Sequence, residues 1–270
     1  MILPGKSDLE PMLRGLRGVL LAPVASGEIH IKHANDFVTE KDLFVETAIR
    51  RALSARYPDF AFLGEEEEAA PIDAAVPTFV LDPIDGTTNF IFDYGMSAVS
   101  LGVLYGGEPV LGAIFDPYSD AFYFAQKGKG AEKNGTPIHV SPAENLSEVL
   151  AAVGTMPYHK EAADELFDTA KRLYLACIDI RRSGAATIDL CHVAQGRVGV
   201  YAERNLSLWD FTAGAVILTE AGGTITDFQG NPVVFRGRSD IACSNGKLHA
   251  ALLDLLHERP RGVKPAKRRN

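Results

Sequence analysis

Cysteine is scarce in this chain of 270 residues, which contains only Cys177, Cys191 and Cys243. The number is odd and the three lie far apart in apolar segments, so the sequence excludes a disulfide-rich secreted scaffold and a cysteine zinc site. Long apolar runs are also missing, and the segment 16–24 is interrupted by an arginine, a glycine and a proline. We therefore expect no signal peptide, no membrane segment and a cytoplasmic location.

Positive charge is in short supply as well. Lysine and arginine total 27 against 35 acidic residues, which gives a net charge of −8 and makes nucleic acid an unlikely main partner. The basic exception is the tail, residues 259–270, which we expect to be a solvated end. The histidines show no spacing typical of a metal site. With 46% hydrophobic residues the chain can still bury a large core.

Two patterns of predicted elements follow one another along the chain. After a helix at 41–57, the first half shows short strands at 60–64, 79–81, 98–105, 110–115 and 121–125, separated by turn signals that favour antiparallel pairing. The second half alternates strands at 178–181, 198–202, 224–226 and 241–243 with helices at 161–175, 185–194, from 210 onward and at 247–257. This pattern predicts a mixed α and β fold in two halves, 1–142 and 143–270.

The most informative motif begins where the apolar strand 79–81 ends. It places the carboxylates of Asp82 and Asp85, then Gly86 and the hydroxyls of Thr87 and Thr88, within seven residues. Such a strand end can present side-chain oxygens and backbone N–H groups to one small volume, as a hard cation bridged to a phosphate requires. The alternative is an ordinary turn in which aspartate and glycine serve only turn geometry.

Two further acids lie at comparable positions. Glu65 directly follows the strand 60–64, whereas the glutamates after it suit a solvated acidic loop. Asp210 opens an apolar helical pattern that is closed by the glycines at 222–223. Alone, Asp210 would be interpreted as a helix cap, which aspartate commonly provides. Together with Asp82 and Asp85 these acids form a candidate metal site.

These residues and their order resemble the inositol monophosphatase family of magnesium-dependent, lithium-sensitive phosphatases. The matching segments are 36–42 (DFVTEKD), 64–66 (GEE), 79–90 (FVLDPIDGTTNF), 128–131 (GKGA), 134–135 (NG), 184–186 (GAA), 209–215 (WDFTAGA) and 220–223 (EAGG). The resemblance extends from about residue 31 to about residue 256. It implies a layered α-β-α-β-α sandwich of the sugar-phosphatase type and a homodimer, for which the neighbourhood of Phe92 and Met96 is our candidate interface.

The resemblance also implies a set of Mg²⁺ ligands. Glu65, Asp82 and the backbone carbonyl of Ile84 would bind a first ion, and Asp82, Asp85 and Asp210 a second. Glu65 would also hold a weaker third ion with water molecules.

Catalytic and phosphate-binding roles follow from the same resemblance. Thr87 would orient the attacking water with Asp42 as its partner, and the N–H groups of Gly86 and Thr87 would hold phosphate oxygens at a helix start. The alternative role for Thr87 is that of a helix cap. Lys32 is a weaker candidate for a lysine near the metal-bound waters.

Substrate recognition is implied at a second group of residues, which are Asp85, Gly184, Ala185, Ala186, Glu203 and Asp210. Many relatives have threonine where this chain has Ala185, which weakens strict inositol specificity. The expected activity is hydrolysis of a small phosphorylated polyol, foremost myo-inositol monophosphate. Alternatives are fructose 1,6-bisphosphate, histidinol phosphate, NADP or 3′-phosphoadenosine 5′-phosphate as substrate, or a non-catalytic role as a partner of the transcription machinery.

Overall fold

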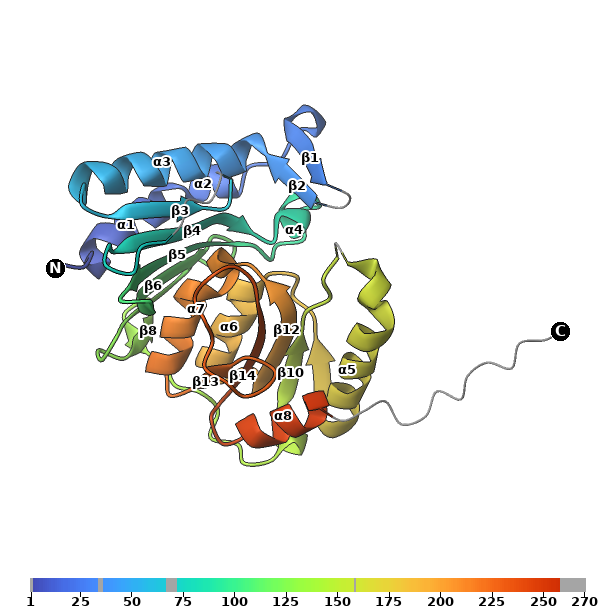
Figure 1. Cartoon of the computed structure of the whole chain (residues 1–270). Coiled ribbons are helices and arrows are strands. Elements are labelled where there is room, and N and C mark those ends of the chain that lie inside the picture. The colour runs from blue at the N-terminus through green and yellow to red at the C-terminus, as the bar shows by residue number, and fades with distance from the viewer. Residues whose placement is uncertain (1, 34–35, 67–71, 158, 258–270) are drawn as a thin grey trace.

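Alternating layers of helices and sheets make up the structure, a computed structural model that describes residues 2–33, 36–66, 72–157 and 159–257 (Figure 1). The predicted basic tail, 259–270, lies outside the described residues. Three apolar clusters fill the spaces between successive layers. The predicted α-β-α-β-α sandwich is therefore confirmed.

A seven-stranded sheet forms the first β layer, with the strand order β3-β4-β5-β6-β7-β8-β9. Its strands are β3 (Ala61–Gly64), β4 (Thr78–Asp85), β5 (Ala98–Tyr105), β6 (Glu108–Asp116), β7 (Ala121–Gln126), β8 (Ala131–Lys133) and β9 (Thr136–Pro137). The strands from β4 onward pair antiparallel, as the turn signals predicted. In contrast, β3 runs parallel to β4, which brings the carboxyl ends of these two strands to one edge.

Helices α1 (Lys6–Gly15), α2 (Arg17–Leu20) and α3 (Glu40–Arg56) cover the outer face of this sheet (Figure 1). Thr39 caps α3, because its hydroxyl accepts hydrogen bonds from the N–H groups of Lys41 and Asp42. The predicted helix 41–57 thus lies within one residue of the observed bounds. Along the chain between α2 and α3 lie the 3₁₀ turn Ser26–Glu28 and the antiparallel pair β1 (Ile29–His33) and β2 (Asp36–Thr39).

The second β layer is a five-stranded sheet with the order β11-β10-β12-β14-β13. Its strands are β10 (Leu150–Val153), β11 (Asp179–Arg181), β12 (Val200–Leu206), β13 (Thr224–Thr226) and β14 (Ser239–Ser244). The outer layer consists of α5 (Ala163–Ala176) and α8 (His249–His257), with 3₁₀ turns at Leu146–Glu148 and Lys160–Ala162. Alternation along β12 sends Tyr201 toward the middle of the molecule and Val200 and Ala202 toward α5 and α8.

Helices α6 (Ala186–Ala194) and α7 (Leu208–Glu220) form the middle layer and pack against both sheets. Close approach of α7 to the first sheet depends on two glycines that pair across β5 and β6, Gly102 and Gly112. A Cβ atom on Gly102 would lie 2.5 Å from the Thr212 side chain, and one on Gly112 would clash with the Ala213 carbonyl. The glycines therefore set the distance between the sheet and the helix that carries Asp210.

Most predicted elements are present, but the sequence analysis did not predict α1, α2, β1, β2, β8, β9 and β10. The helix start expected at Gly86 and Thr87 from the resemblance is that of the five-residue helix α4 (Thr87–Ile91). The division into halves at 142 stays a prediction, although the two sheets lie on either side of that point. All three cysteines are buried and unpaired, as expected. Within the described part of the chain, every helix is too short or too polar to cross a membrane.

Candidate metal and phosphate site

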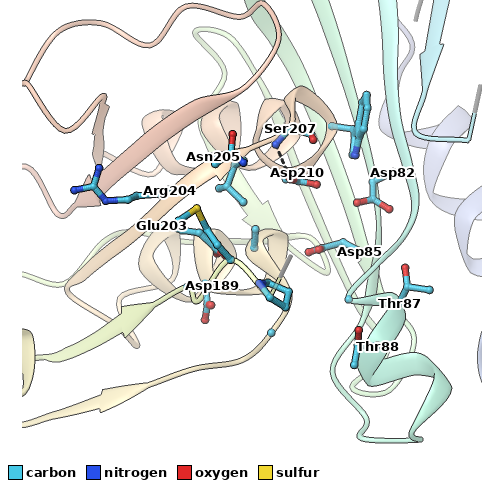
Figure 2. Close-up of a pocket in the computed structure, with 18 of the residues that line it drawn as sticks. Asp82, Asp85, Thr87, Thr88, Asp189, Glu203, Arg204, Asn205, Ser207 and Asp210 are labelled. Carbon is cyan, nitrogen blue, oxygen red and sulfur yellow. Dashed lines mark hydrogen bonds between the residues drawn. The ribbon is translucent and has the colours of Figure 1, made fainter. Parts of the chain in front are cut away.

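A cavity of about 390 Å³ opens where the two sheets and the middle helices meet. Its wall includes the carboxyl end of β4, the first residues of α4, α6 and α7, and the end of β12. Figure 2 shows Asp82 and Asp85 on one side of this space and Glu203, Arg204 and Asn205 on the opposite side. Its volume lies in the range typical of small-molecule sites.

Parallel pairing of β3 and β4 explains how Glu65 reaches the cavity. The register pairs Gly64 with Leu81, so Glu65 and Asp82 follow as neighbours at the same sheet edge. β4 then bulges between Asp82 and Asp85, which lets both carboxylates face the cavity although they are three residues apart. The bulge is stabilised locally, because the Ile84 N–H donates to Asp82 Oδ1 at 3.0 Å.

Asp210 arrives from the first turn of α7. The Ser207 N–H donates to Asp210 Oδ2 at 2.7 Å, so this carboxylate also stabilises the helix start, with Ser207 rather than Asp210 at the cap position. One carboxylate oxygen from each of Asp82, Asp85 and Asp210 lies within 4.8 Å of the others. Asp210 can therefore stabilise the helix start and offer an oxygen to a metal ion in the same conformation.

This grouping is electrostatically unfavourable without a cation. Burial, followed by the charges of Glu65, Asp85 and Asp210, raises the pKa of Asp82 well above its usual range. Burial and the charges of Asp85 and Glu65 do the same to the pKa of Asp210. Burial raises the pKa of Asp85 to about 6 despite hydrogen bonds from Thr187. Because oxygen donors of this kind suit hard divalent cations, the residues fit a magnesium-type site.

The start of α4 lies beside these carboxylates. Gly86 precedes the helix with φ of +86°, and a Cβ atom there would lie 2.9 Å from the Met96 carbonyl oxygen, so the position requires glycine. Thr87 is the first helical residue, and its hydroxyl donates to the Ile84 carbonyl at 3.1 Å. The N–H groups of Gly86 and Thr87, which we expect to bind phosphate, thus lie at a helix start. The helix cap is Gly86, not Thr87.

Asp42 is fully buried at the third position of α3. Its Oδ2 accepts hydrogen bonds from the Thr39 N–H at 2.8 Å and the Thr39 hydroxyl at 2.6 Å. These bonds complete the capping box of α3. The expected pairing of Asp42 with Thr87 stays a prediction. Lys32 belongs to β1, but its side chain lies outside the described part of the chain.

Of the residues expected to bind the polyol, the structure places some in the cavity wall and one outside it. Gly184, Ala186 and Glu203 line the cavity, whereas Ala185 is buried outside the cavity wall, on the side of Gly86. Burial raises the pKa of Glu203 to about 7, against the effect of a hydrogen bond donated by the fully buried Tyr201 hydroxyl. Glu203 is therefore partly protonated near neutral pH.

Two residues on α6 that the sequence analysis did not single out also matter. The Thr187 hydroxyl and its N–H, at 2.7 Å, both donate to Asp85 Oδ2, which orients that carboxylate. Asp189 lines the cavity and accepts a hydrogen bond from the Ser183 hydroxyl at 2.6 Å. Thr187 and Asp189 could have been recognised as candidates because they are polar residues within an otherwise apolar helix, which the structure shows to be buried along most of its length.

The layered sandwich defines a sugar-phosphatase-type fold, and the three grouped aspartates form an acidic centre that could hold a metal ion. More specifically, the chain belongs to the inositol monophosphatase family, whose sequence model matches residues 19–261.

Individual relatives agree with this assignment. The chain is 36% identical over 229 residues to the inositol-1-monophosphatase of Synechocystis, covering 84% of this chain and 79% of that protein. It is 32% identical over 221 residues to the Nus factor SuhB of Vibrio cholerae, covering 82% of this chain and 83% of that protein. Among solved structures, the inositol monophosphatase of Anabaena superposes with a TM-score of 0.75 at 35% identity, covering 80% of this chain and 85% of that one.

Metal-free protein should lose stability as the pH rises. Asp85 has a folded-state pKa of about 6 against 3.8 ordinarily, so in this window the folded protein binds more protons than the unfolded chain. The free energy of unfolding should therefore be higher at about pH 5 than at about pH 7.5, by on the order of 1–3 kcal/mol. Urea unfolding with a chelator measures this difference, and magnesium should reduce it.

The variant Asp85→Asn is the control for this pH effect. Asparagine can still accept the hydrogen bonds from Thr187 but carries no charge, so the pH dependence should become smaller. If metal-free wild-type protein were more stable at the higher of these two pH values, the raised pKa of Asp85 would be contradicted.

Removing the Thr187 hydroxyl should weaken metal binding without emptying the core. Thr187→Val keeps the shape and the N–H donor but loses one of the two hydrogen bonds that Thr187 donates to Asp85, so we expect about 10- to 100-fold weaker affinity for magnesium. Trp209, the single tryptophan, lines the cavity and provides a fluorescence readout. Thr187→Ser retains the hydroxyl and should bind magnesium like the wild type; equal affinity of the valine variant would refute the role.

Proposed function

We propose that this chain is a magnesium-dependent phosphomonoesterase that hydrolyses a small phosphorylated polyol, foremost myo-inositol monophosphate. The observation that carries the proposal is the grouping of three aspartate oxygens within 4.8 Å beside the start of α4. This grouping supplies anionic oxygens for cations, and the neighbouring helix start supplies N–H donors for a phosphate. Family membership supports the phosphatase class, and the name of the Synechocystis relative supports the inositol ester.

The residues present would hold two or three Mg²⁺ ions. Glu65, Asp82 and the Ile84 carbonyl would hold the first, Asp82, Asp85 and Asp210 the second, and Glu65 with waters a third. When bound, these ions neutralise the phosphate, acidify the attacking water and stabilise the leaving oxygen.

The protein's own groups then position the reactants. The N–H groups of Gly86 and Thr87 would donate to phosphate oxygens, and the Thr87 hydroxyl, which donates to the Ile84 carbonyl, would orient the attacking water. Asp42 would be its partner in this role. The bulge at Asp82 to Asp85 keeps these groups at one sheet edge, so few side chains need to be ordered when substrate binds.

The polyol would lie toward Glu203. The carboxyl group of Glu203 faces the space beyond Asp85 and Asp210 and can hydrogen-bond to ring hydroxyls, as can the backbone near Gly184 and Ala186. Ala185 has no hydroxyl to contribute, so we propose tolerance of several polyol esters. We also propose lithium sensitivity from family membership, and a cytoplasmic location, which the three unpaired buried cysteines support.

A second candidate is the non-catalytic role in transcription, which the Nus factor name of the Vibrio cholerae relative favours. The complete acidic cluster supports the catalytic role, because a protein that acted only as a binding partner would not need buried carboxylates that repel one another. Both roles can exist in one protein, so catalysis must be tested directly.

Phosphate release from a substrate panel tests the proposal. Wild-type protein should release phosphate from inositol 1-phosphate with magnesium, lose this activity without magnesium and be inhibited by lithium. Asp85→Asn should lower turnover about 100-fold or more, since a ligand of the second ion loses its charge. Asp254→Asn, an exposed position on α8, is the matched control and should retain wild-type turnover.

The remaining substrates in the panel are fructose 1,6-bisphosphate, histidinol phosphate, NADP and 3′-phosphoadenosine 5′-phosphate. Preference for one of these would change the substrate and keep the mechanism. Magnesium-dependent turnover that survives Asp85→Asn would refute the proposed site. No turnover of any ester would favour the non-catalytic role.

We further propose that the chain forms a homodimer through the loop around Phe92 and Met96. Phe92 and Tyr94, two residues apart in this loop, are 76% and 65% exposed, so a partner at the loop would bury both aromatic side chains. Phe92→Glu should convert dimers to monomers in sedimentation velocity, whereas Phe167→Glu, at a position 68% exposed on α5, should not. A monomeric wild type would contradict this proposal.

A further inference from the structure

A buried junction joins the start of α4 to the loop that precedes α6. Gly86 is the residue before α4, and the loop of residues 182–185 connects β11 to α6. Gly86 and Gly184 both have φ of +86°, and a Cβ atom on Gly86 would lie 3.3 Å from the Gly184 carbonyl oxygen. The loop backbone therefore packs directly on the residue that begins the proposed phosphate site.

Asn89, on α4, is a hydrogen-bonded bridge across this junction. Its side-chain amide nitrogen donates to the Ser183 carbonyl at 2.9 Å and to the Met96 carbonyl at 2.7 Å, which uses both of its N–H donors. A Cβ atom on Gly184 would lie 3.0 Å from this nitrogen, so the loop backbone also packs against Asn89. Because Asn89 and Ser183 are buried, moving the loop away from α4 would leave a donor and an acceptor without partners.

The loop itself is held in shape by the Ser183 side chain. The Ser183 hydroxyl donates to Asp189 Oδ2 at 2.6 Å and accepts from the Ala185 N–H at 3.1 Å. Ser183 and Asp189 are both buried, so water does not compete for these hydrogen bonds. Since they fix the loop internally, the bond from Asn89 to the Ser183 carbonyl positions the backbone of Gly184 as well.

A second bridge across the junction has a different end point. Thr187 donates two hydrogen bonds to Asp85, which is a proposed metal ligand, so this bridge acts on the metal site. Asn89 instead lies outside the cavity wall, and its amide nitrogen donates to backbone carbonyls. Any effect of Asn89 on a bound ester must therefore pass through the position of the backbone that it holds.

We propose that Asn89 is a positioning residue that sets the distance between the phosphate-binding start of α4 and the polyol-binding backbone near Gly184 and Ala186. This inference rests on the proposed function, because it takes the ester phosphate to lie at the start of α4 and the polyol to lie toward Glu203. A polyol ester engages both segments at once, whereas an ester without ring hydroxyls engages only the first. Asn89 thus contributes to the preference for polyol esters although it touches none of them.

Two esters of similar size test this role. Asn89→Asp keeps the size of the side chain but removes both N–H donors and sets a carboxylate against two carbonyl oxygens. Cyclohexyl phosphate has the ring of inositol 1-phosphate without its hydroxyls. At saturating magnesium, the ratio of kcat/KM for inositol 1-phosphate to that for cyclohexyl phosphate should fall about 10-fold or more, mainly through a higher KM for the inositol ester. The added charge acts on the phosphate of both esters, so it cancels in the ratio.

Asn245→Asp is the matched control. The side-chain amide of Asn245 also donates to two backbone carbonyls, those of Ser141 and Ala143, both at 2.8 Å, and Asn245 is also buried. These three residues lie outside the cavity wall. Both aspartate variants should lose stability, but the ratio should fall only in Asn89→Asp. Asn89→Ala removes the bridge without adding charge and should change the ratio in the same direction, which provides a second variant if Asn89→Asp does not fold.

Three results would overturn the role. An equal loss for both esters in the Asn89 variants would assign Asn89 to the phosphate site alone. An equal fall of the ratio in Asn89→Asp and Asn245→Asp would attribute the effect to lost stability. An unchanged ratio would show that the loop does not depend on Asn89.

Failure of the proposed function would be visible separately, as a wild type that hydrolyses neither ester. Trp209 fluorescence with magnesium would then compare the dissociation constants of inositol 1-phosphate and inorganic phosphate. The wild type should prefer the inositol ester by a larger factor than Asn89→Ala does. An equal preference in the two proteins would refute the positioning role.

Discussion

Repulsion among buried carboxylates is the constraint on which this structure depends. Asp82, Asp85 and Asp210 come from two elements that would separate if electrostatics alone decided their positions. They are held together by close packing of α7 on β5 and β6, where Gly102 and Gly112 leave room for the helix backbone. The packing of the core thus supplies the free energy that keeps the charges close, and a bound cation would reduce their repulsion.

The local backbone around the aspartates serves the same end. A bulge at the end of β4, the left-handed Gly86 and the short helix α4 turn one strand end into a concave surface of carboxylates and N–H groups. Asp210 and Asp42 each also stabilise the first turn of their own helix, and Asp85 is held at the start of α6 by Thr187. Capping therefore orients carboxylates that catalysis would also require, with little additional ordering cost.

The cavity is chemically divided. Its acidic side, formed by the first sheet and α7, suits cations, whereas the edge of the second sheet carries Glu203 with a raised pKa. The division arises because the two sides belong to different sheets, between which α6 and α7 lie.

The sequence by itself determined the elements with strong periodicity or a motif, among them α3, β5 and the acidic turn after β4, because local spacing and turn chemistry fix these. Residue resemblance further identified Glu65, Asp82, Asp85 and Asp210 as one group. Only the tertiary structure decided that Ala185 lies outside the cavity wall and that Thr187 orients Asp85. These facts depend on which strands pair and in which register, and the contact of Thr187 with Asp85 joins residues about 100 positions apart, which no local pattern encodes.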